Sequence, residues 1–523
     1  MADTPAETPS LQTSSDSWAL IDHPSLGRTL RATTTIAAGT VLLAERPALL
    51  ATPLRSLSKA QRAAFKAAAE DEDHDLEDLL VAHAFAHAGA DKQKLVLAGA
   101  CGDEVVADPE HPLLRSARRA ATCAAALDEA CAQAIDGVYR CLCIFALNGF
   151  GYLADGLTGG GIALYLTGSK FTHCCLRPNC HFHGQNGRLT FRSVRPIEAG
   201  EILTIDYLGP CGECAAPRRR KQLLAAKAFE CACIECTTLP DTLRPLPCPR
   251  CAPRDAASGL LLTAPDDDAD PACVTRDGSV AADCRTEPAW RCGRCGAALS
   301  DDEVDVPCRA PAAWTGGEWP LRMAPAGLLA WETGLGEAVS NLVRSATERA
   351  VPGVGGGDTA RATATMARSR KTMPTIRAAA AAVVGPQHWV CQALAEAQLD
   401  HWLELLLEHA PGEYPPAAAE DFVLEALENE GSVVAESVDA LFARAEAALL
   451  ALWRRRQRTA LADHILESAT ELCAARKAWA KSGGAEELRP ILEANARRTE
   501  IEYGPASEDA AQARAVLEEI LLI

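Results

Sequence analysis

The chain has 523 residues, of which 48% are hydrophobic and 5% aromatic, and its formal charge is −19 from 51 basic and 70 acidic residues. A chain of this length and apolar content predicts about three folded domains. The negative charge argues against broad binding of nucleic acid, which needs a cationic surface. It favours attraction of a basic protein segment instead.

The start of the chain is polar and acidic and lacks the basic and apolar regions of a signal peptide. No apolar run approaches the roughly 18 residues of a membrane-spanning helix. We therefore expect a protein of the cytoplasm, the nucleus or both. The 22 cysteines would then lie in a reducing compartment, where clustered cysteines indicate metal sites more often than disulfides.

The first half of the chain predicts strands on both sides of a helical segment. Residues 1–16 predict a disordered tail, and residues 39–45 predict a strand that follows a glycine turn. Residues 57–135 are rich in alanine with helical spacing of charged residues. Residues 144–207 return to short strands and turns.

The second half predicts a cysteine-rich region followed by helices. Residues 211–308 hold the cysteines and include an acidic, turn-rich insert at 264–288, which predicts a loop. Residues 320–523 are nearly all helical in pattern, with the last helix beginning after Gly504 and carrying Glu508 and Asp509 in its first turn. One helical face gathers large apolar residues: Trp389, Leu394, Leu399, Trp402 and Leu406.

A compact group of cysteines, Cys231, Cys233 and Cys236, has the C-x-C-x-x-C spacing. Three thiolates this close can hold three corners of a zinc tetrahedron. The fourth ligand must come from elsewhere in the chain. Four cysteines are candidates for it: Cys175, Cys180, Cys211 and Cys214.

A second group consists of two C-x-x-C pairs, Cys248 with Cys251 and Cys292 with Cys295. Together they predict a zinc ribbon, although the gap between the pairs is longer than the usual ribbon spacing. Four thiolates complete the zinc shell and leave no position for water, so both zinc sites would be structural. Cys211 and Cys214 form a further C-x-x-C, which fits a redox pair, a spare metal knuckle or chance.

Four segments, taken in order, resemble the motifs of a SET domain, the catalytic domain of a class of protein lysine methyltransferases. The group at Cys231 to Cys236 falls where such proteins carry a post-SET zinc site. Cys175, in the third segment, is the candidate that we name as its fourth ligand, with the other three cysteines left as alternatives. The segments are residues 26–32 with 36–39, residues 143–148 leading to 161–165, residues 171–179, and residues 200–207.

The branch that the sequence resembles is the SET and MYND domain-containing group, whose SET domain is split by an insertion and followed by helices. The resemblance implies an α+β fold with a SET domain at 17–240, a helical insertion at 57–135 and a zinc cluster at 231–236. A ribbon-like region at 245–308 and a helical, tetratricopeptide-like domain at 320–523 would follow. The MYND finger is absent, because only Cys101 lies near the window where its ligands would stand.

The resemblance also implies an activity and its residues. The chain would methylate lysine side chains of proteins, histone or non-histone, using S-adenosylmethionine, with Tyr207 as the catalytic tyrosine beside the cofactor. Asn148 would bind the methionine end of the cofactor, His173 would meet the adenine through its backbone, and Phe229 would stack on the adenine. The remaining cofactor contacts would come from Gly27, Arg28, Thr29 and Thr172.

Four departures from the family pattern fall near these positions. Thr172 replaces an asparagine, which would remove a cofactor hydrogen bond worth about 1.5–3 kcal/mol, and Thr29 stands where the family has a second small residue. One extra residue precedes Pro178, so either the chain bulges there or Cys174 takes the role of Cys175. Lys227 stands where some relatives have a second channel tyrosine.

Thr29, Thr172 and Lys227 favour an alternative, a catalytically weak SET scaffold that binds partners through its C-terminal helices. A plain zinc-binding interaction protein without a cofactor site is a third interpretation, and the four ordered motifs count against it.

Two further features are open to more than one interpretation. The basic run 218–221 fits a localisation signal, a phosphate-binding patch or a solvated helix face. His181 and His183 fit metal ligands or solvent-facing strand residues.

Overall fold

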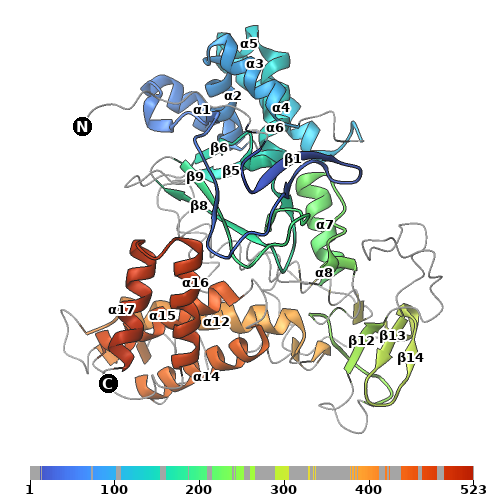
Figure 1. The fold of residues 1–523 in the computed structure, drawn as a ribbon, viewed down its shortest axis with the longest axis vertical. Coiled ribbons are helices and arrows are strands. Elements are labelled where there is room, and N and C mark those ends of the chain that lie inside the picture. The colour runs from blue at the N-terminus through green and yellow to red at the C-terminus, as the bar shows by residue number, and fades with distance from the viewer. Residues whose placement is uncertain are drawn as a thin grey trace.

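The computed structural model describes residues 12–521 with gaps. The parts left out between these bounds are 13, 72–74, 102–105, 107, 153–160, 186–187, 209–214, 238–240, 242, 252–259, 265–288, 306–327, 330–331, 333, 335, 337–376, 378–379, 382, 386, 412–418, 421–422, 425–436, 457–461 and 480–487. Figure 1 shows a bundle of helices at one end of the molecule, strands in the middle, and a small sheet and a second set of helices at the other end.

The central part is built from short strands in several small sheets. β3 (Val41–Glu45), β9 (Arg188–Ser193) and β8 (Cys180–Gln185) form one sheet in that order, and β4 (Leu49–Leu50), β6 (Gly161–Leu164) and β5 (Gly149–Tyr152) form another. β1 (Trp18–His23) pairs antiparallel with β2 (Gly27–Ala32), and β7 (Thr172–His173) pairs parallel with β10 (Thr204–Ile205). Short 3₁₀ turns are η1 (Leu54–Ser56) and η3 (Gly168–Lys170).

The strand predicted at 39–45 is confirmed, since β3 follows the left-handed Gly39 (φ 80°). The core of this part gathers Trp18, whose indole nitrogen donates to the Leu42 carbonyl at 2.9 Å, and Phe171, which stacks on Phe191 with ring centroids 4.1 Å apart. Of the tail predicted at 1–16, residues 1–11 and 13 lie outside the described residues. Within the rest of it, the backbone N–H of Gln12 donates to the Thr167 hydroxyl at 2.9 Å.

The helical insertion lies at one end of the molecule (Figure 1), and its core includes Leu49 of β4 and Leu164 of β6. Its helices are α1 (Lys59–Asp71), α2 (Leu76–Ala86), α3 (Ala90–Gly99), α4 (Pro112–Leu127), α5 (Glu129–Gln133) and α6 (Ile135–Asn148).

The strand pattern expected from residue 144 is wrong at its start, because α6 continues to Asn148. The side chains from Cys141 to Phe145 are all buried, and a short, fully apolar run cannot be assigned to helix or strand by periodicity alone.

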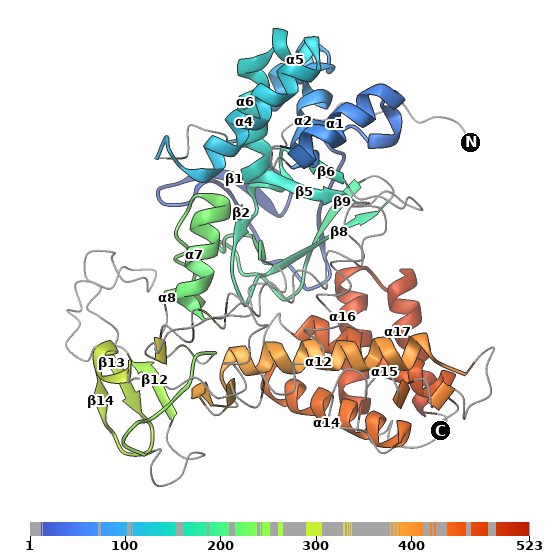
Figure 2. The ribbon, with the colours of Figure 1, turned by 180° about the vertical axis from the view of Figure 1, so that it is seen from behind.

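After the SET strands the chain forms α7 (Ala216–Lys227) and α8 (Ile234–Thr237), which lead to a small separate sheet, as the rear view in Figure 2 shows. This sheet has the order β11 (Leu246–Pro247), β12 (Leu260–Ala264), β13 (Ala289–Cys292), β14 (Ala298–Leu299) and is followed by α9 (Asp301–Val304). The acidic insert beyond Ala264 lies outside the described residues.

The C-terminal part is helical, as predicted. Its long helices are α12 (Trp389–Glu408), α14 (Val438–Arg456), α15 (Ala462–Ala478), α16 (Arg489–Glu502) and α17 (Glu508–Leu521). The apolar face predicted from Trp389 to Leu406 is buried, and Glu508 and Asp509 occupy the first turn of α17. Among the described helices, none has both the length and the apolar run that a membrane crossing requires.

The C-terminal helices contact the central strands through the end of α16. Tyr503, which follows α16, lies against the rings of His181 and His183 on β8, with centroids 5.7 and 5.2 Å apart. Neither histidine is a member of a metal-ligand group among the described residues. Both side chains are half-buried, and they pack between β8 and the end of α16.

Candidate functional site

Tyr207 and His173 meet because their strand ends are paired. β10 runs parallel to β7, so the chain leaves β10 beside His173. The backbone N–H of Tyr207 donates to Nδ1 of His173 at 3.0 Å, and the Tyr207 hydroxyl donates to the Phe171 carbonyl. Burial raises the pKa of Tyr207 above its usual value, with a further contribution from Cys101. The hydroxyl therefore stays protonated at neutral pH.

His173 connects Tyr207 to a cysteine. Since Nδ1 accepts the Tyr207 N–H, the ring proton belongs on Nε2, which donates to the Cys175 sulfur at 3.0 Å. Burial lowers the pKa of His173 to about 4, despite the opposing effect of Cys233. The imidazole is therefore neutral and held in one tautomer, with its side chain turned toward the cysteine cluster.

Phe229 completes an aromatic group with these two residues. Its ring centroid lies 6.4 Å from that of Tyr207, edge to face, and 6.3 Å from that of His173. The preceding Ala228 ends α7 in the left-handed conformation (φ 57°), which non-glycine residues rarely adopt. This turn sends the chain back from α7 so that Phe229 lies beside Tyr207.

The two threonines that depart from the family pattern lie against each other. The hydroxyls of Thr29 and Thr172 share a short hydrogen bond, and the Thr29 hydroxyl also lies 3.3 Å from the Lys170 carbonyl. Thr29 is fully buried. The hydroxyl of one threonine thus satisfies the other, and the two substitutions form one local unit.

Asn148, Arg28 and Cys101 converge at the other end of the site. The Asn148 amide donates to the carbonyls of Ile144 at 3.0 Å and Cys101 at 2.7 Å, and the Arg28 guanidinium lies 3.8 Å from the Cys101 sulfur. Gly27 is left-handed (φ 67°), and a side chain there would touch nothing within 4 Å. The left-handed backbone conformation of Gly27 explains why a glycine stands at this position. Cys101 was missed as a site residue, because no motif surrounds it.

Lys227 does not point into an open space. Its ammonium donates to the carbonyls of Ala146 and Leu147 at 3.1 and 3.2 Å, at the last turn of α6 beside Asn148. A cation at a helix C-terminus is favourable, although burial lowers the pKa of this lysine. Lys227 therefore fixes the end of the helix that carries Asn148.

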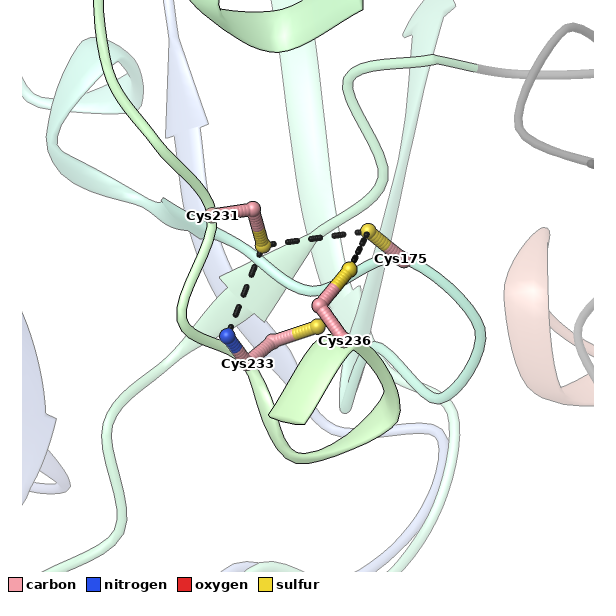
Figure 3. Close-up of side chains that lie close together, drawn as sticks. All are labelled: Cys175, Cys231, Cys233 and Cys236. Carbon is pink, nitrogen blue, oxygen red and sulfur yellow. Dashed lines mark hydrogen bonds between the residues drawn. The ribbon is translucent and has the colours of Figure 1, made fainter. Parts of the chain in front are cut away.

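Cys175, Cys231, Cys233 and Cys236, which we name the SET cluster, come together in the structure (Figure 3). The Cys175 sulfur lies 3.8 Å from that of Cys231 and 3.4 Å from that of Cys236, and the four sulfurs lie within 4.8 Å of one another. Tetrahedral zinc with Zn–S bonds of about 2.3 Å requires sulfurs about 3.8 Å apart. The geometry could therefore hold one zinc ion.

The other candidates for the fourth ligand lie elsewhere or outside the described part. Cys180 donates to the Asn179 side chain at 3.2 Å, and Cys211 and Cys214 are among the residues that the structure leaves out. Cys174 is the first of several thiols whose hydrogen bonds hold the pKa of Cys233 below its usual range. It lies next to the cluster without being one of the four.

Arg219 lies against the SET cluster. Its side chain is fully buried in α7. Burial lowers the pKa of the guanidinium, but Cys236, Asp241 and Cys175 outweigh burial and raise it. The prediction that the basic run forms a solvated face is therefore wrong for Arg219, because a cluster of thiolates needs a buried cation nearby.

The second group, Cys248, Cys251, Cys292 and Cys295, is also assembled, and we name it the ribbon cluster. The sulfurs of Cys248 and Cys295, and those of Cys251 and Cys292, lie 3.8 Å apart. The long stretch of sequence between the two C-x-x-C pairs does not prevent their four sulfurs from meeting. β12 and β13 pair antiparallel with Leu261 opposite Cys292, so the intervening residues leave and return at the far end of this hairpin.

Comparison with known proteins agrees with this geometry. Residues 27–208 match the SET domain family, so the chain carries a SET domain. Over 78 residues it is 45% identical to mouse histone-lysine N-methyltransferase SMYD3 and 42% identical to the human protein, matches that cover 15% of this chain and 18% of each relative. A SET and MYND domain-containing protein of Dictyostelium discoideum is 33% identical over 78 residues, which are 15% of this chain and 18% of that protein.

The SET domain of this chain is thus homologous to that of the SET and MYND domain-containing proteins. The matched segment spans less than a fifth of the length of these relatives.

Proposed function

We propose that this chain is a protein lysine methyltransferase that uses S-adenosylmethionine as methyl donor. The observation that carries the proposal is the arrangement around Tyr207. A half-buried, protonated tyrosine in a SET domain lies beside His173 and Phe229. Cys101, which contacts Arg28 and Asn148, is close enough to help raise the pKa of this tyrosine. The names of the matched relatives, histone-lysine N-methyltransferases, support the same reaction class.

The residues at the site suit this cofactor. S-adenosylmethionine has a charged amino-acid end and a planar aromatic base. Arg28 and Asn148 offer a cation and an amide at one end, and Phe229 offers a half-buried ring at the other. When bound, the cofactor would supply a methyl group on a positively charged sulfur. The Thr29 and Thr172 hydroxyls and the backbone of His173 would contribute further contacts.

The role of the protein in such a reaction is to position the groups and to place dipoles. Methyl transfer to a lysine is an in-line displacement by a neutral amine, so alignment and electrostatics supply the rate. The Tyr207 hydroxyl donates a hydrogen bond to the Phe171 carbonyl. The lone pairs of the tyrosine oxygen are therefore left to accept a hydrogen bond from the incoming amine. His173 holds the Tyr207 backbone in place.

We further propose a substrate class and an organisation. The net charge of −19 favours a basic protein segment, such as a histone tail or a lysine-rich site on another protein, in the cytoplasm or the nucleus. The SET domain would comprise residues 17–240, the ribbon region 245–308 and the helical domain 320–523. The two cysteine clusters would each hold a structural zinc ion.

The experiment measures binding and transfer separately. The full chain is mixed with labelled S-adenosylmethionine and with histones or a cell lysate, and cofactor binding is measured by calorimetry. Tyr207→Phe should leave binding nearly unchanged and lower transfer by about 100-fold, the loss seen when one such dipole is removed. Tyr139→Phe in the helical insertion is the matched control. Absence of cofactor binding to the wild-type chain would overturn the proposal.

A second candidate rests on the Thr29–Thr172 pair. Thr29 donates to the Lys170 carbonyl, so Thr172 is the donor in the bond between the two hydroxyls. Neither threonine then has a hydroxyl proton left to donate to a cofactor. A catalytically weak SET scaffold that binds partners through its C-terminal helices fits this observation. Cofactor binding without transfer to any protein would favour it.

A further inference from the structure

A third cluster of metal-binding side chains lies in the helical insertion, away from both cysteine clusters. His83 and His87 stand four residues apart at the end of α2, so their side chains lie on the same face of the helix. Asp128 comes from the junction of α4 and α5. His83 Nδ1 lies 2.6 Å and His87 Nε2 2.8 Å from Oδ2 of Asp128, and the three donor atoms all lie within 4.8 Å of one another.

The surrounding fold orients each of these groups. Asp128 caps the N-terminus of α5, where its Oδ1 accepts the Ala130 N–H at 2.9 Å, so Oδ2 is left to face both imidazoles. Phe65 packs edge-on against His83, with ring centroids 5.9 Å apart. The carboxylate and the inner imidazole are therefore held in place by the backbone and by packing.

The cluster is closed on one side and open on the other. The side chains of His83 and Asp128 are 11% and 9% exposed, whereas that of His87 is 50% exposed. An ion could reach the three donors past His87. It would keep water on its outer side.

We propose that His83, His87 and Asp128 bind a divalent first-row transition metal ion, with Zn²⁺ the best match. Two imidazoles and a carboxylate suit this class of ion, and three protein ligands leave room for water. In a tetrahedral zinc site, ligand bonds of about 2.0–2.2 Å place neighbouring donors about 3.4 Å apart. The present separations of 2.6 and 2.8 Å would therefore have to open by about 0.6–0.8 Å, and the half-exposed His87 has the room to move outward.

Both imidazoles contact the same oxygen of Asp128, while the other oxygen accepts a backbone N–H. Three donor atoms from two separate segments thus lie within 4.8 Å of one another. A hydrogen-bond network without metal is the competing arrangement, and the titration below distinguishes the two. This site differs from the two cysteine clusters in its ligands and its open side, so it should exchange metal more readily.

The test uses the full chain without a polyhistidine tag, loaded with zinc at both cysteine clusters and then titrated with Co²⁺. The wild-type chain should take up one additional equivalent, with visible d–d absorption and without the thiolate-to-cobalt band that a cysteine site would give. His87→Ala should weaken the affinity for Co²⁺ by at least about 100-fold. Loss of a residue that is only hydrogen-bonded to a ligand lowers metal affinity by about 10–100-fold, and loss of the ligand itself should lower it further. His23→Ala is the matched control and should bind as the wild type does.

A second variant, Asp128→Asn, tests the same site with a side chain that can still cap α5. Its helical content is measured by circular dichroism, and added Co²⁺ should raise the melting temperature of the wild-type chain but not of either variant. The proposal is wrong if the wild-type chain takes up no additional Co²⁺. It is also wrong if His87→Ala and Asp128→Asn both bind it as the wild type does.

Discussion

The SET cluster and the ribbon cluster each consist of four cysteines, but they differ in what surrounds them. The SET cluster contacts His173 through Cys175, and His173 accepts the backbone N–H of Tyr207. It also has a buried cation, Arg219. The ribbon cluster lies at the edge of a small sheet, with Cys295 exposed, and its core is shared with the start of α12.

This difference shows that ligand spacing alone does not determine what a zinc site stabilises. The SET cluster would fix the position of Tyr207 through the imidazole of His173. Loss of zinc from this cluster should therefore disturb the proposed active site. The ribbon cluster would hold a small sheet against the C-terminal helices, so its loss should remain local. The predictions below test this contrast, from the largest expected effect to the smallest.

Loss of a ligand from the SET cluster should have the largest effect. Cys236→Ser should remove one zinc ion and with it much of the roughly 10–16 kcal/mol that such a site contributes. Binding of S-adenosylmethionine should then be lost, since His173 and Tyr207 lose their support. Zinc content by mass spectrometry and calorimetry of cofactor binding measure both effects.

The matched control is Cys251→Ser in the ribbon cluster. It should also remove one zinc ion but leave cofactor binding unchanged. Equal loss of cofactor binding in both variants would contradict the contrast between the clusters.

Replacement of the buried cation should have the next largest effect. Arg219→Met leaves the charge of the thiolates without its partner, and breaking such a buried pair costs about 3–5 kcal/mol. Chemical denaturation of the zinc-loaded chain measures the change in unfolding free energy. Lys221→Met, an exposed residue of the same helix, is the control and should change it by less than about 0.5 kcal/mol. Equal effects of the two substitutions would argue against a role of Arg219 at the cluster.

The contact between β8 and α16 should give a smaller, pH-dependent effect. Burial, with Arg498 and His183 adding to it, lowers the pKa of His181 to about 4, whereas an unfolded histidine has a pKa of about 6.5. Between these values the unfolded chain binds more protons, so stability is complete above pH 6.5 and falls as the pH drops toward 4. The loss should be about 2–3 kcal/mol.

Denaturation of the wild-type chain and of His181→Asn over this pH range isolates the contribution of His181. The variant should show a shallower loss of stability, because asparagine does not titrate. An identical pH dependence would place the effect elsewhere.

Much of the fold could be predicted from the sequence because it depends on local patterns. The strand at β3, the helical C-terminal part and the two cysteine groups all follow from spacing along the chain. The end of α6 could not be predicted, since its fully buried apolar residues have no periodicity that distinguishes helix from strand.

The contacts that join distant segments could not be predicted in this way. The Thr29–Thr172 hydrogen bond and the buried position of Arg219 depend on tertiary packing, and a basic run ordinarily predicts a solvated face. Cys101 carries no motif, and Asp128 stands 41 residues from His87, so the metal cluster in the insertion has no continuous signature. The roles of Asn148 and Phe229 stay predictions from the resemblance, and the Tyr207→Phe experiment tests the role of Tyr207.

The pairing of β4 with β6 has a consequence for how the chain folds. Leu49 and Leu50 lie opposite Leu164 and Ala163, so the two halves of the SET domain meet at the base of the helical insertion. The entropy of closing a loop grows with its length, and distant contacts slow folding. The insertion consists of neighbouring helices, and its core takes in Leu49 of β4 and Leu164 of β6. Packing of the helices therefore draws the two strands together, which shortens the search that joins the two halves of the sheet.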